Sequence, residues 1–373
     1  MSPLLPLLPL LTCLAWGGAP VREPDAPLKV YLVTISPGEE AASVFGHTVL
    51  RIRDEEADED LAWNWGVARF PPVLLPWYFV AGRMPFTTEV RSWASTAKAY
   101  ARRGRRVEVQ QLDLTEAEAR DLRARVEAEA QHRDYDYHYF FDNCATRPRD
   151  HLDAVVGGRV RAATGQVNRP SYRALVRSAT APQPLVGGAL DVVLGRPAEV
   201  ALTRWEAMFL PAELQAGLAE VRLQGPGGEE VPLVARMWTD SSGAVPTTPG
   251  GATPGLAPTV MGLVWSGLLL GAARLRPWLF RLFAAPWCLL AGGIGLVLLA
   301  AWFTDHPTWR WNENLLLFGP WSLALGALLL FQPTSPWFPR LAVATAAVAA
   351  LETLAGLVDP EAQANLAWST LAL

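Results

Sequence analysis

Three side chains in the first half of the chain are of the types that cysteine enzymes use. Cys144 supplies a thiol, His47 an imidazole and Asn64 an amide. A thiolate attacks a carbonyl carbon, an imidazole takes and returns the proton, and an amide orients the imidazole. Each residue also has a plain structural interpretation: a buried small side chain, a hydrogen bond to a carbonyl, and a turn residue between two tryptophans. Residue types alone therefore make this set a hypothesis.

The segment around Cys144 is predicted to open a helix. Asn143 or Asp142 is a good N-cap residue, apolar residues follow at helical spacing, and a pair of glycines predicts the helix end. A cysteine in the first turn lies at the positive end of the helix dipole, which lowers the thiol pKa. Because Pro148 has no N–H, the regular helix is expected to begin near Arg147, with Cys144 in a tight turn before it.

His47 and Asn64 are predicted on two neighbouring strands. Residues 46–53 alternate with period two, which places 47, 49, 51 and 53 on one face. The acidic run 54–60 predicts a hairpin connection, and residues 61–66 return as the partner strand. Asn64 is therefore expected to lie across the strand pair from His47.

Further elements are predicted around these strands. Strands are expected at 29–35 and 107–114, a helix capped by Thr115 with Glu118 is expected to end near residue 131, and another helix is expected over 205–218. Residues 67–104 are aromatic and basic without a clean period, so no element is assigned there.

The extreme N-terminus predicts export. Residues 1–24 contain a short apolar run followed by small residues, which is typical of a signal peptide or an N-terminal anchor. Cys13 allows a lipidation motif, although Thr12 is a poor residue before a modified cysteine. Cys288 falls in a predicted membrane span, so Cys144 is the only thiol of the exported domain, residues 25–240. An unpaired cysteine in an oxidising compartment is expected to be either buried or used.

The C-terminal part is predicted to cross a membrane. Residues 241–257 form a linker rich in Pro, Gly, Ser and Thr, and a transmembrane domain follows over 258–373. About four spans approach the roughly 20 residues that cross a bilayer, at 258–273, 282–303, 315–331 and 341–358. Basic residues gather on the first and third connections, which places these inside the cell and the N-terminal domain outside.

Charge and motif content exclude several classes of partner. The formal net charge is −4, and the excess of acidic residues lies wholly in the first 255 residues, so a nucleic-acid partner is not expected. The five histidines are scattered without paired spacing and no Gly-rich phosphate loop is present, so the sequence predicts no metal and no cofactor.

Five stretches of the sequence resemble the Lnb family of bacterial lipoprotein N-acyltransferases. Three surround the candidate catalytic residues, and two lie between the second and third predicted spans. They are Ser36-Pro37-Gly38-Glu39, Phe45-Gly46-His47-Thr48, Tyr139 to Asp150, Phe303-Thr304-Asp305-His306 and Asn312 to Leu316. The order of histidine before cysteine is also similar to that of permuted papain-like enzymes related to NlpC/P60. The resemblance implies an α+β, permuted papain-like exported domain followed by an all-α transmembrane helical domain in the inner (cytoplasmic) membrane, with the exported domain in the periplasm.

The same resemblance implies an activity and the roles of its residues. Cys144 would take an acyl chain from a membrane phospholipid as a thioester, and His47 would act as base while the α-amine of a diacylglyceryl-cysteine lipoprotein accepts the chain. The N–H of Cys144 and the side chain of Asn143 are expected to hold the oxyanion. Asn64 as orienting group rests on its strand position alone. Further candidates for substrate binding are Arg147, Arg149, Asp305 and His306.

Two other functions use the same residues. A membrane-tethered cysteine peptidase or amidase acting on cell-wall peptide would need the same thiol and imidazole. A non-enzymatic membrane scaffold would keep Cys144 buried and inert. Several membrane spans favour a lipid substrate, because a wall hydrolase needs at most one anchor.

Overall fold

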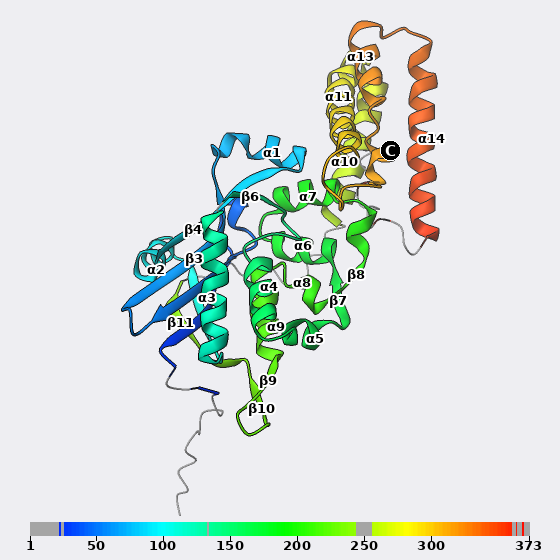
Figure 1. The fold of residues 1–373 in the computed structure, drawn as a ribbon. Helices are drawn as coiled ribbons and strands as arrows, with labels where there is room; N and C mark the ends of the chain where they lie inside the picture. The colour runs from blue at the N-terminus through cyan, green and yellow to red at the C-terminus, as the bar shows by residue number, and fades with distance from the viewer. Residues whose placement is uncertain are drawn as a thin grey trace, which may run out of the picture.

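The structure is a computed structural model that carries a sheet domain followed by a helical bundle (Figure 1). It describes residues 22–23, 26–132, 134–243, 256–359, 363 and 368. The predicted signal segment, with Cys13, lies outside the described residues apart from residues 22 and 23. The same holds for most of the predicted linker.

A seven-stranded antiparallel sheet forms the centre of the exported domain, with strand order β11-β5-β1-β2-β3-β4-β6. The predicted strands at 29–35, 46–53, 61–66 and 107–114 are confirmed as β1, β2, β3 and β5. The strand bounds are β1 Leu28–Ile35, β2 His47–Asp54, β3 Glu59–Ala68, β4 Met84–Ser92, β5 Arg106–Leu112, β6 Asp134–Tyr137 and β11 Val234–Ser242. β11 continues two residues past the predicted domain boundary at 240, because Ser241 and Ser242 still pair with β5.

Helices cover both faces of this sheet. The face with Leu50 and Ile52 packs under α3 Glu116–Gln131, α4 Thr146–Val155 and α9 Pro211–Glu220 in the largest hydrophobic cluster, which also contains Cys144. The opposite face, with Val49 and Ala62, packs against α2 Trp93–Arg102. Alternate residues of a strand face opposite sides, so His47 shares the α2 side with Val49.

The predicted capping box and the predicted stop of the Cys144 helix are both present. Thr115 and Glu118 cap α3 reciprocally, and α3 ends at Gln131 as expected. α4 begins at Thr146, and its end is followed by Gly157 and Gly158 with φ of +67° and +79°. Both glycines occupy the left-handed region that glycine enters most readily.

A second group of helices follows α4. Its members are α5 Arg159–Thr164, α6 Tyr172–Thr180, α7 Pro184–Val193 and α8 Arg204–Ala207. The prediction of a single helix over 205–218 is wrong in detail, because the helix is interrupted between α8 and α9. Pro211 occupies the first turn of α9, where its missing N–H costs nothing and its fixed φ starts a new helix.

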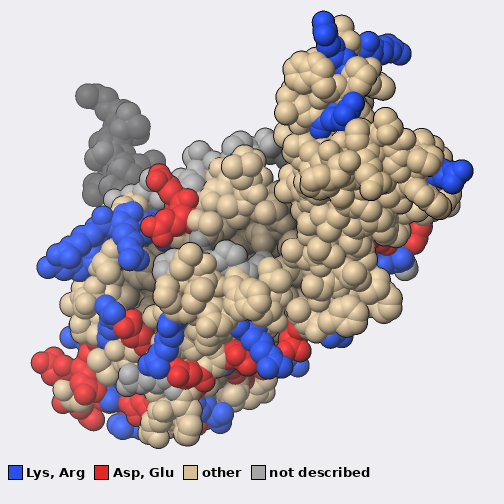
Figure 2. Space-filling model, turned by 90° about the horizontal axis from the view of Figure 1, so that it is seen from above, with Lys and Arg blue, Asp and Glu red and all other residues tan. Residues whose placement is uncertain are grey.

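Three helices of the C-terminal part are long and apolar enough to cross a membrane. They are the helices over Pro277–Ala301, Asn314–Phe331 and Trp337–Val358. The first predicted span corresponds to α10 Leu256–Leu275. Its apolar stretch, Val260–Leu275, is shorter than the other three helices. The helix bounds are α11 Pro277–Ala301, α12 Asn314–Leu317, α13 Ser322–Phe331 and α14 Trp337–Val358. Figure 2 shows that uncharged residues cover most of the bundle, whereas charged side chains gather on the exported domain and at the bundle's ends.

The charges of the bundle follow its topology. Arg274, Arg276 and Arg281 lie at the connection between α10 and α11, and Arg340 lies in the first turn of α14. The connection between α11 and α12, residues 302–313, instead contacts the exported domain. Four of the five basic residues described in the bundle are therefore at the end away from that domain, and only Arg310 lies in the connection that contacts it, as the positive-inside rule favours for an exported domain.

Candidate active site

The start of β2 positions His47. Gly46, directly before it, has φ of +81°, and a Cβ at this position would lie 2.8 Å from the carbonyl oxygen of Ile35. Glycine is thus required both by conformation and by space. Pairing of β2 with β1 reaches His47 opposite Ile35, whereas pairing with β3 ends at Val49 opposite Asn64. The first two residues of β2 are therefore unpaired on the β3 side of the sheet.

A tight turn delivers Cys144 to this end of β2. His138 and Asp142 exchange two backbone hydrogen bonds of 2.9 Å, and the Nδ1 atom of His138 accepts from the N–H groups of Phe140 and Phe141. Cys144 follows in the entering turn of α4, as the position of Pro148 predicted. Its sulfur accepts hydrogen bonds from its own N–H and from the N–H of Thr48. The thiol therefore lies beside the residue that follows His47.

Burial sets the protonation of both reacting groups. It raises the pKa of the Cys144 thiol to about 11, although the two N–H donors lower it. The sequence-based expectation of a lowered thiol pKa is thus wrong in direction for the unliganded site. The thiol precedes the first full helical turn and lies in the hydrophobic core, where loss of hydration outweighs the helix dipole. Burial likewise lowers the pKa of His47 to about 4, so His47 is neutral near pH 7 and free to accept a proton.

Asn64 lies where the strand pattern placed it. Its side chain is 7% exposed and hydrogen-bonds to His47, which by itself would raise the pKa of His47. A hydrogen bond that favours the protonated imidazole is the contact expected of an orienting group, because it stabilises the charge that forms when the imidazole takes a proton. The structure therefore brings His47, Asn64 and the Cys144 segment together.

Asn143 has all its hydrogen-bonding groups in use. Its Nδ2 donates to the carbonyl oxygens of Tyr139 and Phe209, at 2.8 and 3.0 Å, and its Oδ1 accepts from the N–H groups of Ala145 and Thr146. The N-cap residue of α4 is Ala145 and not Asn143 or Asp142, because the regular helix begins only at Thr146; Asn143 instead binds the N–H groups of the turn that leads into it. Both amide hydrogens are donated to carbonyls, so binding an oxyanion would require one of these bonds to break. The Thr48 N–H, which sequence reasoning missed, already points at the sulfur.

Three tyrosines lie close enough to Cys144 for the charge of a thiolate to act on them. The negative charge of a Cys144 thiolate would raise the pKa of Tyr100, Tyr135 and Tyr137, in addition to the larger effect of their burial. Tyr100 also lies 6.2 Å from His47 between ring centroids. Tyr135 and Tyr137 belong to the aromatic run before Cys144, and this run could have indicated from the sequence that they lie near the site. Tyr100 lies on α2, within residues 67–104, where the sequence pattern predicted neither a helix nor a strand.

Arg147 belongs to an ion-pair network under the thiol. It pairs with Glu129 and Asp142, and its guanidinium lies 3.6 Å from the centroid of the Tyr135 ring. Glu129 also accepts from Trp65, at 2.7 Å, and contacts His151. Burial would raise the pKa of Glu129, but hydrogen bonds from His151, Arg147 and Trp65 lower it to about 2. This network fastens α4 to α3 and β3.

Arg149 is also occupied by the protein. Its side chain is 8% exposed, pairs with Asp150, donates to the Trp205 carbonyl at 2.8 Å and lies over the Trp205 ring. Lipid-phosphate binding by Arg147 or Arg149 would therefore require the guanidinium to leave these partners. The structure uses both residues to position α4.

Asp305 and His306 join the exported domain to the bundle. Asp305 forms an exposed ion pair of 2.9 Å with Arg83, and the backbone of Asp305 packs against Gly82. His306 is 1% exposed, lies 3.3 Å from the Tyr139 hydroxyl through Nδ1 and stacks on Trp309. His306 thus contacts the aromatic run that precedes Cys144.

The rest of the connection between α11 and α12 caps α7. Asn312 donates to the carbonyls of Val192 and Val193, and Asn314 donates to that of Val192, all at 2.9 Å. These bonds satisfy carbonyls that the end of a helix leaves without partners. The asparagines quoted from this stretch of the sequence therefore have a structural role in joining the two halves.

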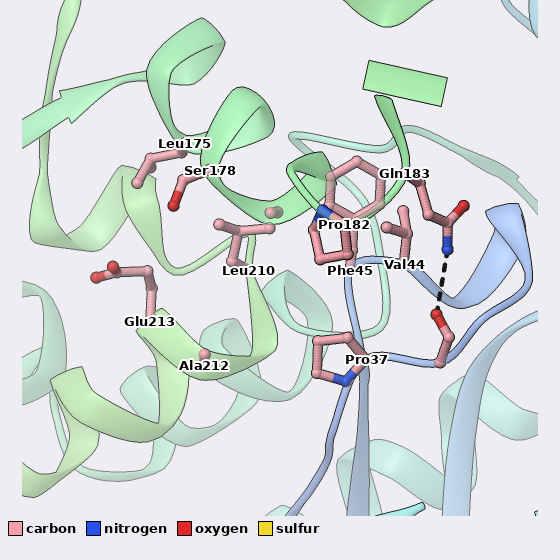
Figure 3. A pocket seen from close by; sticks show the side chains of 12 residues that line it. Pro37, Val44, Phe45, Leu175, Ser178, Pro182, Gln183, Leu210, Ala212 and Glu213 are labelled. Atoms are coloured by element: carbon pink, nitrogen blue, oxygen red, sulfur yellow. Dashed lines mark hydrogen bonds between the residues drawn. The ribbon is translucent and has the colours of Figure 1, made fainter. Parts of the chain in front are cut away.

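An apolar cavity of about 210 Å³ lies beside the loop that leads to His47. Figure 3 shows Val44, Phe45, Leu175 and Leu210 around it, with Gln183 donating to the Gly38 carbonyl at its edge. Phe45 is two residues before His47, and Leu210 follows Phe209, whose carbonyl binds Asn143. The cavity therefore adjoins the loop that precedes His47 and a segment that contacts Asn143, the residue before Cys144. Within the described ranges, no cluster of three His, Cys, Asp or Glu residues could hold a metal ion.

Comparison with known proteins gives one match. Residues 24–178 match the sequence model of a family described as the Lnb N-terminal periplasmic domain. This range contains His47, Asn64 and Cys144 and ends inside α6. Neither the curated proteins nor the solved structures provide a match.

Proposed function

Because residues 24–178 of this chain match the model of the Lnb N-terminal periplasmic domain, we propose that the protein is a cysteine-dependent lipoprotein N-acyltransferase of the inner membrane. The observation that carries the proposal is the placement of Cys144 beside the start of β2, where its sulfur accepts from the N–H of Thr48, the residue that follows the neutral His47. The attachment of this domain to membrane-capable helices supports a lipid substrate. We further assign the domain a permuted papain-like arrangement, with histidine before cysteine in the chain.

The first step forms a thioester. The Cys144 sulfur attacks the ester carbonyl carbon of a membrane phospholipid while His47 takes the thiol proton. The carbon–sulfur bond forms, the ester carbon–oxygen bond breaks, and His47 returns the proton to the departing lysophospholipid oxygen. The N–H groups of Cys144 and Thr48 stabilise the oxyanion, since they lie next to the attacking atom.

The second step forms an amide. The α-amine of a diacylglyceryl-cysteine lipoprotein attacks the thioester carbon, and His47 removes a proton from that amine. The carbon–sulfur bond breaks, and the imidazolium returns its proton to the Cys144 sulfur. Asn64 holds the imidazole through both steps, and the cavity next to Phe45 receives part of the acyl chain.

The test follows the acyl group on the enzyme. After incubation of the purified protein with phospholipid, mass spectrometry should find an acyl mass on the Cys144 peptide that hydroxylamine removes. Addition of a diacylglyceryl-cysteine peptide should discharge it as an N-acyl product. Cys144→Ala should lose both signals, whereas Cys288→Ala, which changes the other described thiol, should keep them.

Two results would contradict the proposal. One is acyl transfer at the wild-type rate by the Cys144→Ala protein. The other is cleavage of a cell-wall peptide without phospholipid and without any acyl-enzyme, which would establish the peptidase alternative. A chain that shows neither chemistry would be the scaffold.

A further inference from the structure

An apolar segment leads from β3 to β4 and includes α1, Leu75–Ala81. Residues 70–82, here named the α1 segment, contain no charged residue, and Arg69 and Arg83 flank them. Val73 is 80% exposed, Trp77 72% and Leu74 40%. A run of large apolar side chains that is this exposed marks an interaction surface in a folded protein.

The α1 segment stands beside the membrane-capable helices. α1 contacts α11, and Figure 1 shows it on the side of the exported domain that carries the bundle. At its end, Gly82 has φ of +75°, and a Cβ there would lie 3.0 Å from the backbone nitrogen of Asp305. The ion pair between Arg83 and Asp305 closes the same contact. The segment is therefore fixed next to the periplasmic end of α11.

Exposed aromatic residues mark the same level on the bundle. Phe303 is 84% exposed and Trp311 is 66% exposed, and both follow the last turn of α11. Trp and basic residues are enriched at the boundary between hydrocarbon and water. The composition of the α1 segment, with Trp77 inside it and an arginine at each end, is that of an interfacial membrane element.

We propose that the α1 segment inserts into the periplasmic leaflet of the membrane and forms the place where lipid enters the thiol site. Its occupant is lipid, because the segment is continuous with helices that lie in lipid themselves. A row of aromatic rings joins it to the site: Phe70 lies 5.5 Å from Phe86, and Phe86 stacks on Tyr137 at 4.5 Å. Tyr137 directly precedes the His138–Asp142 turn that leads to Cys144. The insertion itself does not depend on acyl transfer, whereas the role in lipid entry rests on the proposed function.

The test measures lipid contact directly. Val73→Cys and Trp77→Cys are made in a full-length chain whose native cysteines are replaced, labelled with an NBD fluorophore and reconstituted in vesicles. Met237→Cys on β11 is the matched control, because Met237 is an apolar residue with 57% exposure at the opposite edge of the sheet. Val343→Cys, 70% exposed on α14, is the reference for lipid contact.

The expected result is blue-shifted emission at positions 73 and 77 that dibromo-phosphatidylcholine quenches, as at position 343, with no quenching at 237. Quenching at 73 and 77 equal to that at 237 would overturn the proposal. So would a blue shift that brominated lipid does not quench, because the segment would then be covered by protein. Native protein that inserts in this way but forms no acyl-enzyme would contradict the proposed function while leaving the insertion standing.

Discussion

At the scale of single residues, burial dominates the electrostatics of the site. The Cys144 thiol and the His47 imidazole are both neutral near pH 7, because each loses more hydration than its hydrogen bonds return. An active nucleophile of this kind reacts slowly with thiol reagents. Poor labelling of Cys144 therefore does not distinguish an enzyme from an inert scaffold, and detection of an acyl-enzyme is needed instead.

The pKa of His47 predicts the pH dependence of acyl transfer. The base must be neutral to act, and His47 becomes protonated only as the pH falls towards about 4. We expect kcat/KM for the phospholipid donor, which reports the thioester-forming step and not the protonation of the accepting amine, to stay level from pH 8 to about 5, whereas a base with an ordinary pKa of about 6.5 would lose activity tenfold per pH unit below that value. A pH–rate profile with vesicle phospholipid measures this, and a fall centred near pH 6.5 would contradict it.

Asn64→Ala tests the orienting role in the same profile. Loss of its hydrogen bond should lower the pKa of His47 further, so the acid limb should not move upwards. The rate should fall by roughly 10- to 100-fold, as for other orienting partners, and by less than in His47→Ala. An unchanged rate in Asn64→Ala would leave Asn64 as a strand residue only.

At the scale of elements, one carboxylate holds the Cys144 helix in place. Glu129 on α3 receives hydrogen bonds from Arg147 and His151 of α4 and from Trp65 of β3. The carboxylate is partly buried, so these bonds replace water that it would otherwise keep. The position of Cys144 relative to β2 therefore depends on a residue that takes no part in the proposed chemistry.

Glu129→Gln is predicted to destabilise the protein in a pH-dependent way. The folded pKa of about 2, against an ordinary value of 4.5, corresponds to roughly 3 kcal/mol of stability at neutral pH. Because the folded pKa is the lower one, this stability is present above pH 4.5 and is lost as the pH falls towards 2. The apparent unfolding midpoint in detergent should drop for Glu129→Gln, with a smaller difference from wild type at pH 3.

Glu127→Gln is the matched control on the same helix. Glu127 pairs with Arg123 in a largely exposed pair, which contributes at most about 1 kcal/mol. If both variants shift the midpoint equally, Glu129 does not fasten α4.

The cavity between α6 and the 37–45 loop is predicted to set the acyl chain length. Ala179→Phe places a ring in the cavity, so transfer from long-chain phospholipids should fall relative to short-chain donors. Ala174→Phe, on an exposed position of α6, should leave the preference unchanged. Competition between two donors of different chain length measures the ratio directly. The same ratio in all three proteins would place the acyl chain elsewhere.

At the scale of the whole molecule, the connection between α11 and α12 fixes the exported domain to the bundle. The Tyr139 hydroxyl lies 3.0 Å from that of Thr308, and the Gly195 N–H donates to the Thr308 carbonyl at 2.8 Å. A Cβ on Gly195 would lie 2.3 Å from the carbonyl oxygen of Arg310, so the two backbones approach as closely as only glycine allows. A domain held in this way keeps its thiol at a constant place relative to the membrane helices.

This attachment predicts a crosslink between the two halves of the chain. Arg83→Cys with Asp305→Cys should react with a short bismaleimide in membranes, because the native side chains form an ion pair. A protease site placed between residues 244 and 255 then separates the halves unless they are joined. Met237→Cys with Asp305→Cys is the control pair. Equal crosslinking by both pairs would show that the domain moves freely.

Several elements of the fold could be predicted from local sequence patterns. Alternation predicted β1, β2, β3 and β5, the capping box predicted α3, and hydropathy predicted the helices that are long and apolar enough to cross a membrane. Strand pairing also predicted Asn64 beside His47, because a short hairpin leaves little choice of register. The residues quoted around His47 and Cys144 lie within the range that matches the family model.

Features that depend on packing between distant parts of the chain could not be predicted from the sequence. The direction of the thiol pKa shift depends on the hydrophobic core around Cys144. The sequence indicated only the dipole of the helix that follows Cys144, not the burial of the thiol. The use of Asn143, Arg147 and Arg149 depends on partners that include Phe209, Glu129 and Trp205, distant in the chain. The α1 segment is exposed where it lies beside α11, and this contact between distant parts of the chain is visible only in the folded structure. Hydrogen bonding and desolvation act between residues that are close in space, and a sequence states only which residues are close along the chain.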